Sequence, residues 1–325
     1  MKTTVAVLRG GPSSEYEVSL RTGAEVLKTL DPERYQGRDV FIDRQGAWYV
    51  HGAPALPERA LRGVDVVFNV VHGEYGEDGR LHAILETFGV PYTGPERFAT
   101  TLAFNKQRTK DAVSKLGILV ARGVVADKPA EAELEEMTHL LFRSFPMPAV
   151  VKPVIGGSSV GVTLARDFHS LRDGLERAFA IAPKALVEEY IRGREATVGV
   201  IDHFRGERAY ALLPVEIIPP SGNPFFDYDA KYGGGTQEIC PGNFSAAEKD
   251  ALMDLSRRAH EGLGMRDYSR SDFIVSKRGI YFLEINSAPA VGLTEGSLLP
   301  KAVAAVGSEL SDFVSHIIEL ARARG

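Results

Sequence analysis

Short apolar runs that end in glycine and lead into helical patterns constrain the fold of this chain more than any other feature. Val5–Leu8 and Val64–Val71 have the length of strands, and a helical pattern follows each of them, the second over Leu81–Phe88. Strands that alternate with helices predict a parallel sheet, in which ligands bind at the carboxyl ends of the strands. The loops 9–17 and 72–79 lie at such ends and are candidate binding loops.

The rest of the chain is expected to form two further units, because 325 residues are too many for one small core. A second unit would begin with a helix over 98–116 and continue with strands around a glycine-serine loop. A third would consist mainly of strands, among them 185–191 and 209–218, with a helix over 246–263. The predicted class is α/β at the N-terminus and α+β in the C-terminal part, divided into units 1–95, 96–183 and 184–325.

Composition narrows the range of partners and compartments. The formal net charge is −5 and opposite charges are interspersed, so no basic stripe is available for nucleic acid. Cys240 is the only cysteine, which excludes an intrachain disulfide. The apolar runs are too short for a membrane span, and residues 1–11 lack the features of a secretory signal. These features predict a cytoplasmic protein.

A loop rich in small residues runs from Lys152 to Gly161 between two β-branched runs. Glycine lets backbone N–H groups approach a ligand, serine adds hydroxyl donors, and Lys152 can place a positive charge on phosphate oxygens. A Walker A loop or a dinucleotide fingerprint would instead connect a strand to a helix. The pattern predicts a phosphate-binding loop, and a plain hairpin turn is the alternative.

Two strands separated by Lys277–Gly279 predict an antiparallel hairpin that carries acidic side chains. A three-residue loop with glycine in its left-handed third position would pair Ser276 with Ile280. In that register Asp272 lies directly opposite Glu284. Opposed carboxylates repel each other, so strand pairing alone does not explain their presence.

A divalent cation between these carboxylates would remove the repulsion. In the same register Arg270 lies opposite Asn286, and period-2 alternation puts all four side chains on one face. Asp, Glu and Asn oxygens are hard ligands suited to Mg²⁺, so the hairpin predicts a metal site. The alternative is a solvated face on which Arg270 is the counter-ion of Asp272. The opposite face would point toward a core with Phe273, Val275, Tyr281, Leu283 and Ile285.

Five motifs in the correct order resemble those of the D-alanine–D-alanine ligase family of the ATP-grasp superfamily, over nearly the whole chain. They are GGPSSEYEVS (10–19), VHGEYGEDG (71–79) with PYTG (91–94), KPVIGGSSVGV (152–162), FDYDAKY…CP (226–241), and RSDF with LEINSAP…GSLLPK (270–301). Any one of them could occur by chance, but five in sequence are highly specific.

The resemblance implies an ATP-grasp fold. Unit 1–95 would bind substrate, and units 96–183 and 184–325 would sandwich ATP. The implied reaction is the ATP-dependent joining of two D-alanines through an acyl phosphate, which releases ADP and phosphate and serves peptidoglycan precursor synthesis. The implied cofactors are ATP and two Mg²⁺ ions, for which Mn²⁺ would substitute. The implied assembly is a homodimer.

The resemblance also assigns roles to individual residues of this chain. Nucleotide contacts are implied for Lys106, Lys152, Ser159, Glu188, Ile191, Glu195 and Lys231. Metal ligation is implied for Asp272, Glu284 and Asn286. Catalytic roles are implied for Glu15, Ser158, Tyr232, Arg270 and Ser297. Substrate contacts are implied for His72 and Leu298. A lid over 221–235 would keep water from the acyl phosphate, and tyrosine at 232, where ester-forming relatives carry histidine, favours an amine as acceptor.

The chain departs from the family pattern at three places. Gly156 and Ile155 stand where family members often have glutamate and arginine, and Ala290 stands where the pattern has glycine. The connection 291–296 is about two residues longer than usual. Two alternatives therefore stay open: an ATP-grasp ligase of another amino acid pair, or a nucleotide-binding regulator that has lost catalysis. D-alanine-dependent consumption of ATP separates the regulator from the enzyme.

Overall fold

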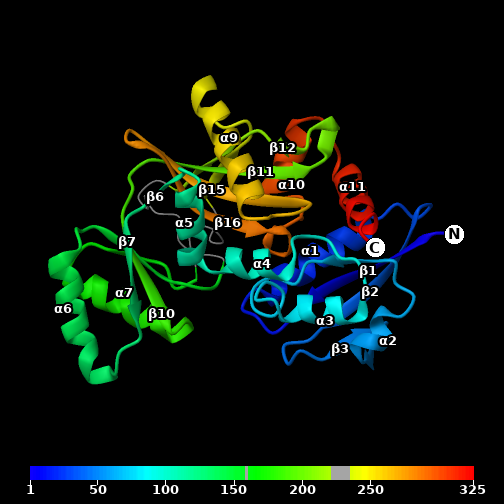
Figure 1. Ribbon diagram of the computed structural model, residues 1–325, viewed down its shortest axis with the longest axis horizontal. Coiled ribbons are helices and arrows are strands. Elements are labelled where there is room, and N and C mark those ends of the chain that lie inside the picture. Colours follow the sequence, from blue (N-terminus) through cyan, green and yellow to red (C-terminus); the bar gives the residue numbers. More distant parts are fainter. Residues whose placement is uncertain (158–159, 221–234) are drawn as a thin grey trace.

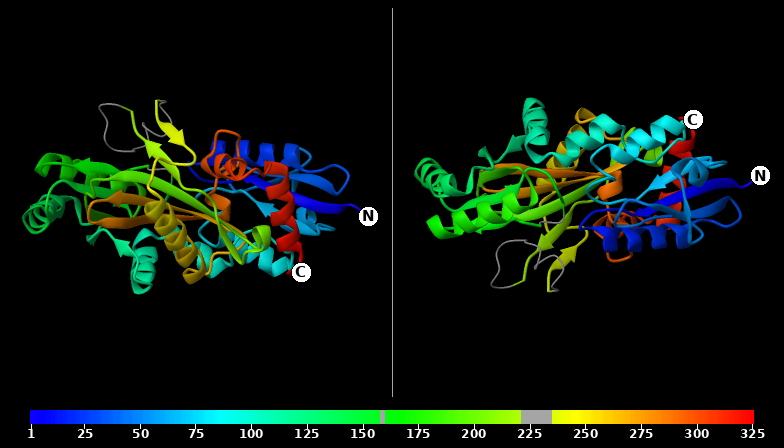
Figure 2. Two further views of the ribbon diagram at one scale, coloured as in Figure 1. Left: turned by 90° about the horizontal axis from the view of Figure 1, so that it is seen from above. Right: turned by 90° about the horizontal axis from the view of Figure 1, so that it is seen from below.

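The computed structural model describes residues 1–157, 160–220 and 235–325, and their strands form three sheets (Figure 1). The N-terminal sheet lies on the right of Figure 1, a four-stranded sheet on the lower left, and a seven-stranded sheet between and above them. The views from above and below show the three units following one another along the long axis (Figure 2). This arrangement agrees with the α/β and α+β class predicted from the sequence.

The N-terminal sheet has the strand order β4-β3-β2-β1-β5, in which β1, β2 and β5 are parallel. Val5 to Leu8 of β1 are fully buried, which explains the continuous apolar run. The predicted parallel sheet is confirmed, although β2 to β4 were not identified from the sequence. The bounds are β1 Thr3–Gly10, β2 Tyr35–Ile42, β3 Trp48–Val50, β4 Ala53–Ala55, β5 Val66–Asn69, α1 Tyr16–Thr29, α2 Pro57–Leu61 and α3 Arg80–Phe88.

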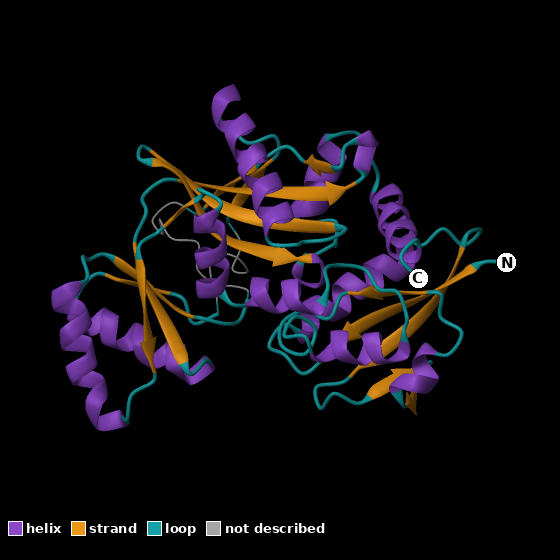
Figure 3. Cartoon of the chain, viewed as in Figure 1, coloured by secondary structure: helices purple, strands orange, loops and turns teal. Residues whose placement is uncertain are grey.

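The four-stranded sheet has the order β7-β10-β8-β9, and its pairs are antiparallel. Helices α6 and α7 pack against it through a shared apolar cluster, and they lie together in Figure 3. Strand β10 follows residue 183 but hydrogen-bonds to both β7 and β8, so the sheets divide after β10. The bounds are β7 Gly123–Asp127, η1 Glu131–Glu133, α6 Leu134–Ser144, β8 Ala149–Pro153, β9 Thr163–Ala165, α7 Phe168–Ile181 and β10 Lys184–Glu189.

The seven-stranded sheet has the order β14-β13-β11-β15-β16-β6, with β12 paired to β11. The strand predicted over 209–218 is two strands, β12 and β13, which pair with different parts of β11. The bounds are β6 Leu119–Val120, β11 Arg194–Asp202, η2 Phe204–Gly206, β12 Ala209–Ala211, β13 Val215–Ile218, β14 Gln237–Ile239, α9 Ala246–Gly262, β15 Tyr268–Ser276, β16 Gly279–Ser287 and η3 Ala288–Ala290.

The single helix predicted over 98–116 is wrong. The structure has two helices, α4 (Arg97–Phe104) and α5 (Lys106–Lys115), separated by Asn105. The Asn105 side chain accepts a hydrogen bond of 3.0 Å from the Arg108 N–H, and its backbone is extended. Asparagine is a strong N-cap residue, so it starts a new helix inside an otherwise helical pattern.

The N- and C-terminal parts of the chain share one core. Helices α10 (Leu298–Ala305) and α11 (Leu310–Arg322) pack into the apolar cluster that contains residues of β1, β5 and α1. This packing sets the carboxyl ends of β1 and β5 against the region where β16 leads into α10. Within the described ranges, no helix combines the length and the apolar character that crossing a membrane requires.

Candidate active site

The β15–β16 hairpin brings together the polar residues predicted for a metal site. Asp272 is paired with Glu284, and Arg270 is paired with Asn286, as predicted. The predicted turn is wrong, because Ser276 pairs with the glycine that begins β16 and the loop has only two residues. A β-bulge shifts the register between Asp272 and the next residue, which compensates for the shorter turn.

The bulge also changes which side chains face the core. Leu283 is the extra residue, so Leu283 and Glu284 both line a cavity instead of alternating. Phe282, which is fully buried, packs against Phe273 in the apolar cluster. The prediction that Tyr281 and Leu283 point toward the core is therefore wrong, whereas Phe273, Val275 and Ile285 do belong to it.

Asp272 has several hydrogen-bond partners. Arg270 donates to both of its carboxylate oxygens, at 3.1 and 3.0 Å, the Asn286 amide donates at 3.0 Å, and the Thr197 hydroxyl donates at 2.5 Å. The alternative interpretation of Arg270 as the counter-ion of Asp272 is thus also met by the structure. Glu284 lies on the neighbouring strand, with one oxygen 3.6 Å from Lys106 Nζ.

These three predicted ligands fit the oxygen chemistry of Mg²⁺. Asp272 and Glu284 supply two carboxylates and Asn286 an amide on one face of the hairpin. In the described part of the chain, no group of three or more His, Cys, Asp or Glu side chains could hold a metal alone. Mg²⁺ in nucleotide sites uses one or two carboxylates and takes its other ligands from phosphates and water, so a larger protein cage is not required.

Two cavities meet at this hairpin. The first, about 360 Å³, lies between the four-stranded and seven-stranded sheets. The second, about 400 Å³, lies between the N-terminal loops and the segment from β16 to α10. Six residues line both of them: Lys106, Gly156, Gly157, Arg270, Glu284 and Leu298. A molecule in one cavity can therefore be in contact with a molecule in the other.

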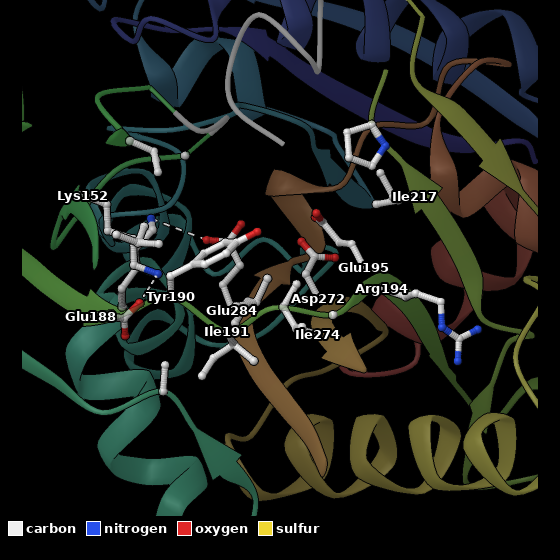
Figure 4. Close-up of a pocket in the computed structure, with 18 of the residues that line it drawn as sticks. Lys152, Glu188, Tyr190, Ile191, Arg194, Glu195, Ile217, Asp272, Ile274 and Glu284 are labelled. Atoms are coloured by element: carbon white, nitrogen blue, oxygen red, sulfur yellow. Dashed lines mark ion pairs between the residues drawn. The ribbon is translucent and has the colours of Figure 1, made fainter. Parts of the chain in front are cut away.

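The first cavity collects the described residues that were predicted to contact nucleotide, which are Lys106, Lys152, Glu188, Ile191 and Glu195. Figure 4 shows Lys152 and Glu188 on one side and Glu195 with Asp272 across from them. Apolar side chains such as Ile191, in the connection after β10, and Ile274, from β15, give the cavity surfaces suited to a flat aromatic base.

Glu188 is the centre of a buried ion cluster at the wall of this cavity. Its carboxylate lies 2.7 Å from Lys152 Nζ and also accepts a hydrogen bond from Lys110. Burial raises the pKa of Glu188, but the two lysines outweigh it and the net pKa is lowered. Burial and the neighbouring Lys152 lower the pKa of Lys110 to about 8, against the opposing effect of Glu188. Lys110 was not identified from the sequence.

The second cavity is lined by every described residue that was predicted to contact an amino acid substrate. Glu15 and His72 follow β1 and β5, as their positions at the strand ends predicted, and both are buried. The glycine-serine loop packs against Glu15, because a Cβ atom on Gly157 would lie 2.7 Å from Glu15 Oε2. Ser297 and Leu298 line the far side at the start of α10.

Glu77 is a further carboxylate of this cavity that sequence reasoning missed. It is 8% exposed and accepts a 2.5 Å hydrogen bond from the Gly73 N–H. Burial, followed by the nearby charge of Glu15, raises the pKa of Glu77 to about 8. The sequence did contain a signal for Glu77, because this residue lies in the same motif as His72, after β5 and at the same edge of the sheet.

The segment after β16 accommodates the alanine at 290. Ala290 lies in the 3₁₀-helix η3, so its backbone does not need the positive φ that alanine adopts poorly. Further along, the Thr294 and Ser297 hydroxyls lie 2.8 Å apart. A Cβ atom on Gly292 would lie 2.9 Å from Ser297 Oγ, so glycine leaves room for that hydroxyl.

Four predicted site residues lie outside the described ranges. They are Ser158, Ser159, Lys231 and Tyr232, and most of the expected lid, 221–234, also lies there.

Comparison with known proteins adds to this geometry. Two family models match the chain: "D-ala D-ala ligase N-terminus" over residues 4–61 and 52–95, and "D-ala D-ala ligase C-terminus" over residues 113–319. The D-alanine–D-alanine ligase of Syntrophobacter fumaroxidans is 37% identical over 98% of each chain. The D-alanine–D-alanine ligase of Geobacter sulfurreducens is 38% identical over 98% of this chain and 94% of its own.

Solved structures with the same fold include two ligases. The VanG D-Ala:D-Ser ligase from Enterococcus faecalis superposes with a TM-score of 0.85, at 27% identity, over 98% of this chain and 99% of that one. The D-alanine–D-alanine ligase from Coxiella burnetii gives a TM-score of 0.84, also at 27% identity, over 99% of this chain and 94% of that one.

Proposed function

Because this chain belongs to the D-alanine–D-alanine ligase family, we propose that it joins two D-alanines at the expense of ATP, for peptidoglycan precursor synthesis. The carboxylate of the first D-alanine attacks the γ-phosphorus, the bond to the β-phosphate oxygen breaks, and ADP leaves. The amine of the second D-alanine then attacks the acyl phosphate carbonyl, loses a proton and expels phosphate.

The observation that carries this proposal is the junction of the two cavities. A nucleotide in the first cavity and amino acids in the second would meet at Lys106, Arg270 and Glu284, which line both. Phosphoryl transfer requires mainly positioning and neutralisation of charge. Lys106 and Arg270 bring two cations to the place where the transferred phosphate would lie.

Magnesium is the cofactor that fits the hairpin. Bound Mg²⁺ would polarise the phosphate oxygens and neutralise their charge, and Mn²⁺ is expected to substitute for it. Asp272, Glu284 and Asn286 are the residues that we propose as its ligands. The Asn286 amide nitrogen donates to Asp272, so the amide oxygen is the atom that would serve as the ligand of the cation.

The amino acids are held by residues of the second cavity. The buried Glu15 carboxylate is suited to the ammonium group of the first D-alanine, and His72 beside it to orienting that substrate. Ser297 is the N-cap of α10, so the acceptor's carboxylate would meet a hydroxyl and the positive end of a helix. Ser158 and Tyr232 keep their predicted role in closing the site, and Ser159 and Lys231 theirs in binding phosphates.

D-serine is a second candidate acceptor. One of the solved relatives with the same fold is the VanG D-Ala:D-Ser ligase. In this chain the Thr294 and Ser297 hydroxyls lie at the acceptor end of the second cavity, where they could hydrogen-bond to a serine hydroxyl. Such hydroxyls also fit the carboxylate of D-alanine, which remains the preferred substrate.

The deciding experiment is a panel of D-amino acids, L-amino acids and D-hydroxy acids, assayed by phosphate release and by product mass. D-alanyl-D-alanine as the main product supports the proposal, and a mixed D-alanyl-D-serine product supports the second candidate. ATP binding without release of ADP at any D-alanine concentration would favour a regulator. We also propose that the protein is a cytoplasmic homodimer. Light scattering after size-exclusion chromatography measures its oligomeric state.

A further inference from the structure

Glu188 is held between two lysines that differ in their access to the nucleotide cavity. Lys152, from β8, and Glu188, from β10, both line the first cavity. Lys110, from α5, lines neither cavity, although it donates a hydrogen bond to the other oxygen of the same carboxylate. The Lys110 side chain is only 3% exposed, so it lies behind Glu188 and cannot reach a bound molecule directly.

The two lysines are also expected to behave differently when nucleotide binds. Lys152 begins the glycine-serine loop, and its proposed role is to contact phosphates, which compete with Glu188 for its charge. Lys110 has no such competitor, so it would remain the constant partner of the carboxylate. A buried carboxylate without a cation is strongly disfavoured, and it regains neutrality by binding a proton.

The charge state of Glu188 determines which base edge it can recognise. An ionised carboxylate only accepts hydrogen bonds, so it matches the 6-amino group of a purine and repels a 6-oxo group. A protonated carboxyl group would donate to the 6-oxo group instead. Discrimination of this kind is large in a buried site, because the wrong base leaves a polar group unpaired.

We propose that Lys110 is a positioning residue that keeps Glu188 ionised and oriented, so that the site selects 6-aminopurine over 6-oxopurine nucleotides. The inference rests on the proposed ATP-dependent function, and it further places the base of the nucleotide beside Glu188, in the cavity that Ile191 also lines. The net lowering of the Glu188 pKa by its two lysines agrees with it.

The test compares ATP with inosine triphosphate, which differ in the base only at position 6 and N1. Binding of each is measured by calorimetry without D-alanine, so the result does not depend on ligase activity. In the K110M variant, the ratio of the Kd for inosine triphosphate to the Kd for ATP is expected to fall at least about tenfold, mainly because ATP binds more weakly. The matched control is K184M, because Lys184 lies on the same strand as Glu188 but pairs with Asp127 at the surface.

A double-mutant cycle with Glu188→Gln separates this role from general damage. In the E188Q background the carboxylate is gone, so adding K110M is expected to leave the ATP preference unchanged. If K110M does not fold, the E188Q/K110M double variant decides, because it removes Glu188 together with its buried partner Lys110; a wild-type preference for ATP in that variant would overturn the proposal. An unchanged preference in folded K110M, or an equal loss in both backgrounds, would overturn the proposal. Absence of D-alanine-dependent turnover with intact ATP selectivity would instead contradict the ligase function alone.

Discussion

Ionisable side chains around the second cavity have their charge set by neighbours from other elements before any substrate arrives. Glu77 illustrates this, because burial and Glu15 raise its pKa from 4.5 to about 8. Between these two pH values the folded protein binds one more proton at Glu77 than the unfolded chain does. Stability contributed by this group is therefore present below pH 4.5 and is lost as pH rises through 8.

Glu77→Gln is expected to remove this part of the pH dependence. Wild type should lose unfolding free energy between pH 6 and 8.5 by up to about 1.4 kcal/mol per pH unit more than the variant. Urea unfolding of the ligand-free proteins across this range measures the difference. The control is Glu58→Gln at the surface of α2, which should keep the wild-type slope. Parallel curves for wild type and Glu77→Gln would show that Glu77 is ionised in the folded protein.

Glu284 is the residue at which the metal, the nucleotide and the amino acid are proposed to meet. Glu284→Gln keeps the size of the side chain and one acceptor oxygen but removes the charge that a cation needs. We expect D-alanine-dependent ADP release to fall about 100-fold or more, with circular dichroism unchanged. Glu207→Gln on the exposed surface is the control. Wild-type turnover in Glu284→Gln would show that the hairpin is not the metal site.

At the scale of secondary structure, one polar capping residue fixes the position of Lys106, for which we propose a contact with phosphate. Asn105 caps α5 and so fixes Lys106, the first residue of that helix, whose Nζ donates to the Gly156 carbonyl of the glycine-serine loop. The Lys106 N–H also donates to Val154 O at 2.9 Å. The cap therefore joins α5 to the end of β8.

Asn105→Ala is expected to cost about 1 kcal/mol of stability and to raise the KM for ATP several-fold, because Lys106 loses its fixed position. Asp167→Ala is a matched control, since Asp167 caps α7 by accepting a similar hydrogen bond from the Ser170 N–H and lines neither cavity. Both variants should melt at a lower temperature, and only Asn105→Ala should change the KM. Equal KM values would contradict the link between the cap and the nucleotide site.

These elements also show what sequence reasoning can reach. Period-2 alternation was enough to place Asp272 opposite Glu284, because the shorter turn and the bulge compensate each other. The bulge itself was not predictable, since it depends on Phe282 filling the core beside Phe273, a contact between two strands. Lys110 was missed for the same reason, because its partner Glu188 is 78 positions away in the sequence.

At the scale of the whole molecule, the C-terminus ties the first unit to the third. Arg324 donates to both oxygens of Asp267, at 2.5 and 2.8 Å, and to Tyr92 O at 3.0 Å. Asp267 is 1% exposed and also accepts a 2.7 Å hydrogen bond from the Gly94 N–H. Gly94 lies next to the predicted boundary at 95, so this cluster fixes the N-terminal unit where it joins the rest. No local pattern reveals contacts between residues more than 170 positions apart.

Arg324→Ala is expected to weaken substrate binding in the second cavity but not in the first. Among the described residues, those that line the first cavity all come from beyond position 95, whereas the second takes Glu15 and His72 from the N-terminal unit. Loosening that unit should therefore raise the KM for D-alanine by about tenfold and leave ATP binding within about twofold of wild type.

Removing the arginine also leaves Asp267 buried without its cation, at a cost of about 3 kcal/mol. The double variant with Asp267→Asn should recover much of this stability but not the D-alanine affinity, because neither variant restores the bridge to Tyr92. Steady-state kinetics in D-alanine, calorimetry with ATP and urea unfolding distinguish these outcomes, and a parallel weakening of ATP would mean that the C-terminus supports the whole fold and not the second cavity.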